Sequence, residues 1–171
     1  MRQVRGFTLV ELVVTVVILA IVIMFAIPSF NTLMNRISTN SSRDKILTAF
    51  HYARSEAISQ QAEVTICASA DGANCSATSN WTSGWIVFLD DNGNQTVDTG
   101  DNVLSVWQNE LVHGATLEED NNKVATTFDA NGTIGIPLVL TLEPFTNCGV
   151  TEARVFTLSP VGRMAVTEGD C

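Results

Sequence analysis

A single carboxylate interrupts a long apolar segment near the start of the chain. Between Phe7 and Ile27 nearly every residue is apolar, and Glu11 is the only charged one. A charged side chain inside a membrane helix costs about 2.5–3.5 kcal/mol on insertion scales, and it is usually kept because it meets a partner. The carboxylate could therefore pair with a positive group on a neighbouring molecule, or it could reach water at the membrane edge.

Four cysteines form a second group that could do chemistry. All of them follow the apolar segment: Cys67, Cys75, Cys148 and Cys171. If Arg2 and Arg5 hold the N-terminus in the cytoplasm, the cysteines lie on the far side of the membrane, where disulfides form. Three pairings are open. We favour Cys67–Cys75, which closes a short loop, with Cys148–Cys171, which ties down the C-terminus. Zinc binding is the alternative, but the chain has no Cys-x-x-Cys and its histidines, His51 and His113, are isolated.

An Asp-rich stretch has the spacing of a calcium-binding loop. Oxygen-bearing side chains occupy positions 1, 3, 5, 7, 9 and 12: Asp90, Asn92, Asn94, Thr96, Asp98 and Asp101. Position 6 is Gln95 rather than glycine, position 12 is Asp rather than Glu, and strands rather than a helix pair are expected on either side. The alternative is an acidic hairpin loop that turns at Asn92-Gly93. We therefore assign no metal ligand and leave calcium binding open.

No catalytic motif accompanies these residues. The chain lacks Gly-x-Ser-x-Gly, a phosphate-binding glycine loop, His-Glu-x-x-His and a reactive Cys–His pair. The acidic run Glu118-Glu119-Asp120 is expected to form a solvated turn. We predict a protein that is not an enzyme and that needs no cofactor.

The charge distribution argues against nucleic acid as a partner. The net charge is −9, and from Glu63 onward 15 acidic side chains face three basic ones, a net of −12. Such a surface repels phosphate backbones, so DNA binding would need a small local basic patch.

The elements that position these residues begin with one long helix. Residues 7–27 span about 31 Å as a helix, which matches the hydrocarbon core of a bilayer. Residues 28–62 continue as an amphipathic helix, with Phe30, Leu33, Met34 and Ile37 on one stripe. We expect a bend at Pro28, loose helix near residues 38–43, and packing of this second half on the globular domain.

After residue 62 the hydrophobic period changes from that of a helix to that of a strand, and polar turns separate the runs. Seven strands are predicted: Val64–Ala68, Trp85–Leu89, Val103–Trp107, Val124–Phe128, Leu138–Leu142, Arg154–Leu158 and Arg163–Val166. The predicted fold is α+β, with a long N-terminal helix packed on a small antiparallel β-rich domain over residues 63–171.

The start of the chain resembles the signal of type IV prepilins. The stretch from Gly6 to Leu12 combines a basic leader over residues 1–6, a Gly-Phe junction, an acid five residues after it and a long apolar run. The resemblance implies cleavage after Gly6 and methylation of the new N-terminus at Phe7. In a filament of bundled, staggered helices, Glu11 would then meet the Phe7 amino group of the neighbouring subunit and fix the axial register.

Beyond the signal, the chain resembles the FimT/GspH family of minor pilins and pseudopilins. The matching pieces run in order along the sequence: 53–58 (Ala-Arg-Ser-Glu-Ala-Ile), Val64, Cys67, Trp81, 84–88 (Gly-Trp-Ile-Val-Phe), Asp90, Phe128, Gly132, Cys148 and 162–163 (Gly-Arg). The resemblance implies a helix with two small β-sheets. Some members are linked to DNA uptake through a basic stretch after Gly-Arg, but here no second basic residue follows Arg163.

Together these features predict a minor pilin that primes or joins a type IV pilus through its N-terminal helix. The alternatives are a type II secretion pseudopilin and a DNA-binding receptor at the filament tip, and the sequence does not decide between pilus and secretion machine. Expected partners are other pilins or pseudopilins, the prepilin peptidase and an inner-membrane assembly platform. The expected location is the bacterial inner membrane, with a single span and a periplasmic C-terminal domain, or the pilus tip. Trp81, Trp85 and Trp107 are expected in the core rather than in a ligand platform.

Overall fold

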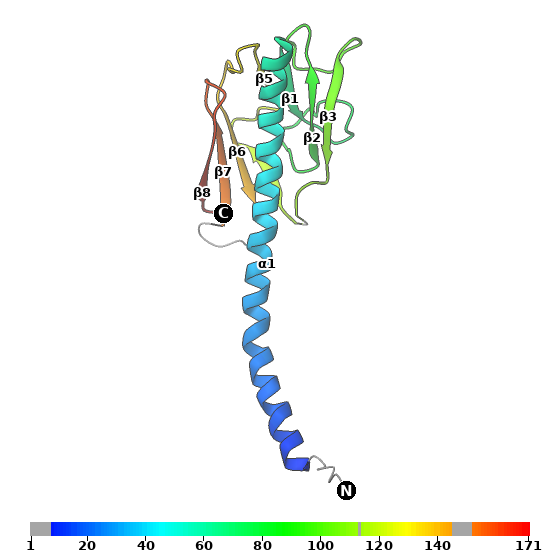
Figure 1. The fold of residues 1–171 in the computed structure, drawn as a ribbon. Coiled ribbons are helices and arrows are strands. Elements are labelled where there is room, and N and C mark those ends of the chain that lie inside the picture. The colour runs from blue at the N-terminus through cyan, green and yellow to red at the C-terminus, as the bar shows by residue number, and fades with distance from the viewer. Residues whose placement is uncertain (1–7, 113, 145–151) are drawn as a thin grey trace. The chain divides into compact units, whose positions relative to one another are not determined.

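One long helix opens the structure and eight strands follow it (Figure 1). The computed structural model describes residues 8–112, 114–144 and 152–171, and for residues 25–29, 31, 32 and 35 it describes the backbone alone. Helix α1 runs over Leu9–Gln60. The chain divides into two compact units, residues 1–37 and residues 38–171, so α1 contributes to both.

Helix α1 ends through its backbone geometry. Gln61 has a positive φ of 52°, and the Ala62 N–H donates to the Ala57 carbonyl at 3.3 Å. This pairing of a left-handed residue with a bond back across the last turn is a Schellman-type cap, which satisfies carbonyls that the helix leaves open. The helix therefore stops close to residue 62, where the sequence placed its end.

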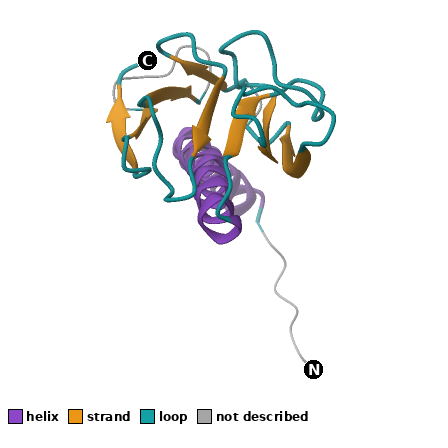
Figure 2. Ribbon diagram, turned by 90° about the horizontal axis from the view of Figure 1, so that it is seen from above, coloured by secondary structure: helices purple, strands orange, loops and turns teal. Residues whose placement is uncertain are grey.

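The strands form two antiparallel sheets of four. Sheet A has the order β3-β2-β1-β5 and sheet B the order β4-β6-β7-β8. The strand bounds are β1 Val64–Ala68, β2 Gly84–Leu89, β3 Asn102–Gln108, β4 Thr116–Glu119, β5 Ala125–Phe128, β6 Leu138–Glu143, β7 Ala153–Leu158 and β8 Met164–Gly169. In the view of Figure 2 the strands arch over the helix. The α+β, pilin-like fold predicted from the sequence is confirmed.

Both sheets share one hydrophobic core with the part of α1 that lies in the second unit. The helix contributes Ile46, Phe50 and Ala53, and large buried side chains come from both sheets. Trp81 and Trp85 are fully buried in this core, and Phe50 stacks on Trp81 with ring centroids 6.0 Å apart. Trp107 is half-buried and meets Tyr52 edge to face at 5.8 Å. The expectation that the tryptophans belong to the core rather than to a ligand platform is met for Trp81 and Trp85.

A second, smaller cluster lies on the other face of sheet A. Its buried members are Cys67, Ile86, Phe88 and Ala125. Cys75 and Val97 pack against it from the loops that follow β1 and β2. Strands β1 and β2 are therefore buried on both faces.

The sequence missed β4, and it misjudged the acidic run at residues 118–120. Glu118 and Glu119 lie in β4, and the Glu119 side chain is buried. Its carboxylate accepts bonds from the backbone N–H groups of Asn121 at 2.7 Å and Lys123 at 2.6 Å. These donors compensate for burial of the charge. The predicted solvated turn is wrong because Glu119 organises the β4–β5 turn from within the fold.

Candidate assembly surface

The first turn of α1 is fixed by Thr8 and Glu11. The backbone N–H and the hydroxyl of Thr8 each donate to Glu11 Oε2 at 3.0 Å, and the Glu11 N–H donates to Thr8 Oγ1 at 3.2 Å. This reciprocal arrangement is a capping box, which satisfies N–H groups that a helix start leaves open. The sequence argument missed this role, although Thr-x-x-Glu before an apolar run is its signature.

The residues that follow Glu11 form an exposed apolar helix. From Leu9 to Met24 the large apolar side chains are 45–79% exposed. Burying such a side chain stabilises it by about 1.5–3 kcal/mol, so a surface of this size in water indicates that something else covers it. Among the described residues, no helical stretch is both long enough and apolar enough to cross a membrane.

A second apolar stripe follows on the same helix. The four side chains that the sequence placed on it, Phe30, Leu33, Met34 and Ile37, are exposed by 43–61%. Within the second unit, the helix face that is buried begins at Thr39 and Ser42 and continues through Ile46.

The predicted cleavage junction lies outside the described residues. Gly6 and Phe7 belong to this part of the chain, so cleavage after Gly6 and methylation of Phe7 remain predictions. The same holds for pairing of Glu11 with the Phe7 amino group of a neighbour, because the structure contains one chain.

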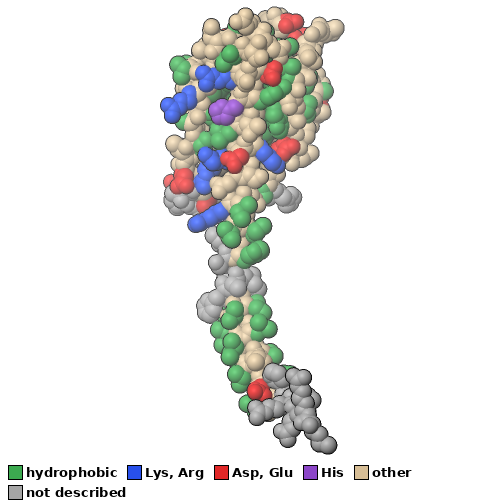
Figure 3. Space-filling model, in the orientation of Figure 1, with side chains coloured by type: hydrophobic (Ala, Val, Ile, Leu, Met, Phe, Trp, Pro, Cys, Tyr) green, Lys and Arg blue, Asp and Glu red, His purple; other side chains and the backbone are tan. Residues whose placement is uncertain are grey.

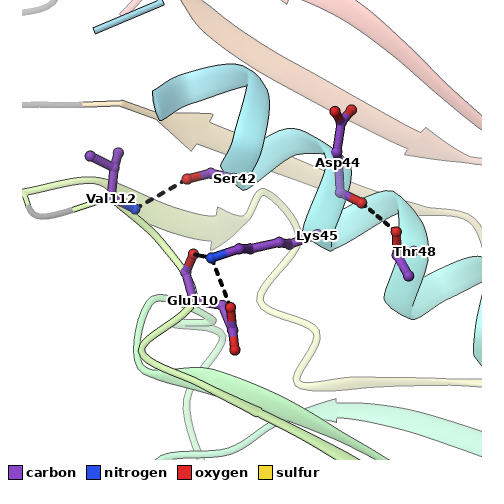
Figure 4. Close-up of polar contacts among 6 residues, drawn as sticks. All are labelled: Ser42, Asp44, Lys45, Thr48, Glu110 and Val112. Carbon is purple, nitrogen blue, oxygen red and sulfur yellow. Dashed lines mark hydrogen bonds and ion pairs between the residues drawn. The ribbon is translucent and has the colours of Figure 1, made fainter. Parts of the chain in front are cut away.

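Polar residues hold α1 to the loop that follows β3, where the sequence predicted loose helix (Figure 4). The Ser42 hydroxyl accepts from the Val112 N–H at 3.1 Å. The Lys45 ammonium donates to the Glu110 carbonyl at 2.9 Å and pairs with its carboxylate at 2.8 Å. The expectation of looseness at residues 38–43 is wrong, because α1 is continuous there and Thr39 and Ser42 are buried.

A second set of hydrogen bonds, made by Arg54, joins α1 to two turns of the β unit. Arg54 Nε donates to the Gly132 carbonyl at 3.0 Å, and its Nη2 donates to the Val161 carbonyl at 3.0 Å. Gly162 has φ +71°, and a Cβ added there would lie 1.9 Å from the Gly132 carbonyl oxygen. Only glycine fits this approach. Three separate pieces of the sequence resemblance, at residues 54, 132 and 162, therefore meet at one structural contact.

The disulfide prediction is confirmed for one pair. Cys67 and Cys75 are bonded, with their Cα atoms 5.6 Å apart. Cys171 is also disulfide-bonded. The partner that the sequence suggested, Cys148, lies outside the described residues, so this second pairing remains a prediction.

The Asp-rich loop is held by bonds within the protein. Asp90 is fully buried and accepts from the Thr65 hydroxyl at 2.7 Å and from the N–H groups of Asn94 and Gln95 at 3.1 and 2.9 Å. Asp98 accepts from the side-chain amides of Asn92 and Asn94, which lower its pKa. The loop oxygens thus have donors of their own. Within the described residues, no group of three or more His, Cys, Asp or Glu side chains is arranged to hold a metal ion.

Arg163, the residue considered for DNA contact, is an exposed residue of the turn between β7 and β8. Its carbonyl accepts from the Ser159 N–H at 3.0 Å, and the Ser159 hydroxyl bonds the same turn. Strand β8 starts only at Met164, one residue later than expected, and continues to Gly169.

Comparison with known protein families identifies two matches to this chain. The model of the type II transport protein GspH matches residues 43–162, and the prokaryotic N-terminal methylation motif matches residues 1–27. The chain belongs to the GspH family. Proteins of this kind are type IV pilin-like structural subunits, minor pilins or pseudopilins of the type IV pilus or the type II secretion system.

Solved structures support the fold independently. Two crystal forms of the type IV minor pilin FimU of Pseudomonas aeruginosa (strain PAO1) are similar to this GspH-family chain, each at 23% sequence identity. The P21 form has a TM-score of 0.62 and covers 79% of this chain and 92% of FimU. The P65 form has a TM-score of 0.52 and covers 75% and 91%. A comparison with curated proteins finds no match.

Proposed function

We propose that this protein is a minor pilin that primes or joins a type IV pilus through its N-terminal helix. The observation that carries the proposal is the contrast within α1. An exposed apolar segment headed by the Thr8–Glu11 box matches the methylation motif, and the β unit that follows buries its own core. A helix with so large an uncovered apolar surface fits a bilayer before assembly and a bundle of neighbouring helices afterwards.

The processing steps follow from the same segment. The prepilin peptidase cuts after Gly6 and methylates Phe7, and residues 7–27 hold the protein in the inner membrane with the β unit in the periplasm. Arg2 and Arg5 favour this orientation because basic residues stay on the cytoplasmic side. In the filament, Glu11 meets the Phe7 amino group of the adjacent subunit, which neutralises two charges in an apolar surrounding. Other pilins and an inner-membrane platform are the assembly partners.

The assignment to the pilus rather than to secretion rests on likeness to FimU, a type IV minor pilin by its description. A deletion strain tests it through the amount of pili that can be sheared from the cell surface. Pili are expected to fall at least tenfold and to return when the gene is supplied in trans. Unchanged pili in the deletion strain would contradict the pilus assignment.

A pseudopilin of the type II secretion system is the second candidate. The GspH family match over residues 43–162 favours it, because that model is described as a type II transport protein. The same deletion strain separates the two, since a pseudopilin defect leaves pili intact and retains secreted enzymes in the periplasm. Fractionation of a secreted hydrolase between periplasm and medium measures this.

A further inference from the structure

Two open sheets have four edge strands, and natural proteins usually cover or distort such edges. Strand β3 is distorted by a register shift opposite Val87 and Phe88, and its Gln108 side chain donates to the Ser69 carbonyl in the loop that follows β1. Strand β4 is covered along its outer side, because the Trp81 N–H donates to the Leu117 carbonyl at 2.8 Å. The edge at β3 is therefore irregular, and the edge at β4 is covered within the chain.

Strand β5 is short and partly capped, although a hollow of about 660 Å³ lies beside it. It has four residues, and Phe128 at its end is bridged to Ile134. The Thr127 hydroxyl bonds to both Thr65 and the Gln95 side chain, which occupy part of this edge. Strand β8 differs because it combines six residues with a regular ladder.

The outer edge of β8 presents a row of backbone groups. The Ser159 N–H donates to the Arg163 carbonyl at 3.0 Å, and this bond sets the phase of the β7–β8 ladder. Because bonded and non-bonded pairs alternate in an antiparallel ladder, every second residue of β8 directs its N–H and C=O away from β7. These residues are Met164, Val166 and Glu168. Among the described residues none of their backbone groups has a hydrogen-bond partner, and the six β7–β8 pairs contain neither a bulge nor a proline.

Cationic side chains lie beside this edge, although Glu168 on the strand and the unit as a whole are acidic. Residues 38–171 carry 17 acidic and six basic side chains. Five of the six basic ones lie on α1, on β7 or in the turn before β8: Arg43, Lys45, Arg54, Arg154 and Arg163. Figure 3 shows the basic side chains gathered over α1 and the strands beside it.

One hollow combines these cations with the β8 edge. Arg43 and Arg154 line a cavity of about 240 Å³ together with Asn40 and residues 166–168 of β8. Arg154 pairs with Glu168 at 3.7 Å and donates to the Glu152 and Ala153 carbonyls at 3.3 and 2.9 Å. Arg43 pairs with the exposed Asp44 at 3.3 Å. The exposed Arg163 stands at the other end of the strand. A strand rises about 3.3 Å per residue, so the two cationic ends are separated by about five residues, or about 17 Å.

We propose that the outer edge of β8 receives an extended acidic segment of a neighbouring filament subunit, which adds a fifth strand to sheet B. The backbone groups of residues 164, 166 and 168 supply the ladder, as in other complexes formed by strand addition. Arg163 and Arg43 bind two carboxylates about five residues apart in the incoming segment. The identity of the occupant as a filament subunit rests on the proposed function. The ability of the edge to bind an acidic strand is independent of the proposed function.

The direct test uses the full chain in detergent micelles and two seven-residue peptides, blocked at both ends. Both alternate valine and threonine; one has glutamate at positions 1 and 6 and the other has lysine there. The glutamate peptide is expected to slow amide hydrogen exchange at Met164, Val166 and Glu168 at least tenfold, and the lysine peptide is not. No slowing with either peptide, or equal slowing with both, overturns the proposal. Slowing by a 12-base-pair DNA duplex but not by the glutamate peptide overturns it in favour of nucleic acid.

A variant pair identifies the backbone as the contact. Val166→Pro removes one outward N–H and is expected to weaken binding of the glutamate peptide at least tenfold. Val166→Thr keeps that N–H and the branched shape, so it is expected to bind within twofold of the parent. Tryptophan emission checks that both variants are folded, since the three tryptophans are residues 81, 85 and 107. Equal binding by both folded variants would overturn strand addition.

Complementation of the deletion strain separates this inference from the proposed function. If Val166→Thr restores sheared pili and Val166→Pro does not, the edge acts in assembly. If deletion removes pili and Val166→Pro restores them fully, the β8 proposal fails and the pilin assignment stands. If deletion affects neither pili nor secretion, the assignment fails, and the peptide experiment alone decides whether the edge binds an acidic strand.

Discussion

The two units of the chain differ in the exposure of their large apolar side chains. Over Leu9–Met24 the large apolar side chains of α1 are exposed, and in the β unit the same residue types are buried between α1 and two sheets. Leu19 is 58% exposed, whereas Leu140 is fully buried. Among the described residues, one helix thus carries a segment whose apolar side chains are exposed and a segment whose apolar side chains are buried.

This difference separates what folds the protein from what assembles it. Contacts in the β unit are made within the chain, so their loss lowers the free energy of unfolding. Under the proposed function, the exposed segment gains its contacts from lipid or from other subunits, so changes there should act on assembly and leave the β unit stable. The comparison makes the two classes of substitution distinguishable by experiment.

Glu11→Ala gives the largest expected effect on assembly. Its carboxylate is held by Thr8 in the single chain and, under the proposal, meets the neighbouring N-terminus in the filament. We expect at least a tenfold loss of this protein from sheared filaments, with cleavage after Gly6 unchanged on immunoblots. Glu56→Ala, which removes a half-buried acid of the second unit, is the matched control and should assemble normally. Normal incorporation of Glu11→Ala would break the comparison.

A matched pair of Leu→Ala substitutions gives the largest expected effect on stability. Leu140→Ala opens a cavity in the shared core and should lower the free energy of unfolding by about 2–5 kcal/mol. Leu19→Ala removes the same atoms from an exposed position and should leave it within about 0.5 kcal/mol. Denaturant titration of the full chain in detergent, followed by tryptophan emission, reports the β unit alone. Equal losses would show that the helix segment and the β unit unfold together.

The Cys67–Cys75 bond belongs to the β unit and should act on stability alone. It closes a loop of eight residues in sequence separation, for which the chain-entropy model gives about 2–3 kcal/mol. Replacing both cysteines by alanine should lower the melting temperature by about 5–12 °C, because a 1 kcal/mol loss shifts a domain of this size by a few degrees. Incorporation into filaments at low temperature should persist. Loss of incorporation with an unchanged melting temperature would assign the loop to assembly instead.

Sequence reasoning succeeded where one periodicity dominates and where few residues compete. The strands from Val64 and Trp85 were placed to within a residue because buried apolar runs have few other solutions. The Cys67–Cys75 pair was found because close cysteines in an oxidising compartment usually bond. In contrast, β4 was missed because only one of its four residues, Leu117, is apolar and further acids follow it.

The remaining misses share one cause, namely that polar side chains were assumed to face water. Ser42, Lys45 and Glu119 each bond a backbone group that is distant in sequence, and no local pattern announces such a partner. The Thr8–Glu11 capping box is different, because its Thr-x-x-Glu spacing is visible in the sequence. It was overlooked because Glu11 had been assigned to a contact with a neighbouring subunit. Arg54, Gly132 and Gly162 were noted only through family resemblance, and their shared contact could be seen only in three dimensions.

The smallest expected effect is a loss of stability of the β unit at acid pH, which arises from Asp129. Asp129 accepts from the Thr133 hydroxyl at 2.6 Å and from the Thr133 N–H at 3.0 Å, and these bonds lower its pKa below the ordinary value of 3.8. A carboxyl with a lowered folded pKa contributes stability above its unfolded pKa and loses it as pH falls through the folded one. The melting temperature should therefore fall below about pH 4, and Asp129→Asn should make that fall shallower.

The control for this prediction lies within the same unit. Asp91 is exposed and only its backbone N–H is bonded, to Asp101, so Asp91→Asn should leave the acid-side slope unchanged. Asp129 closes the turn that presents the Gly132 carbonyl to Arg54. We therefore expect protonation of Asp129 to weaken the hydrogen bond between Arg54 and Gly132 as well. If that coupling operates, Arg54→Ala lowers the melting temperature at pH 7 and removes part of the pH dependence that Asp129→Asn removes. Fully additive slopes in the double variant would show instead that the two groups act independently.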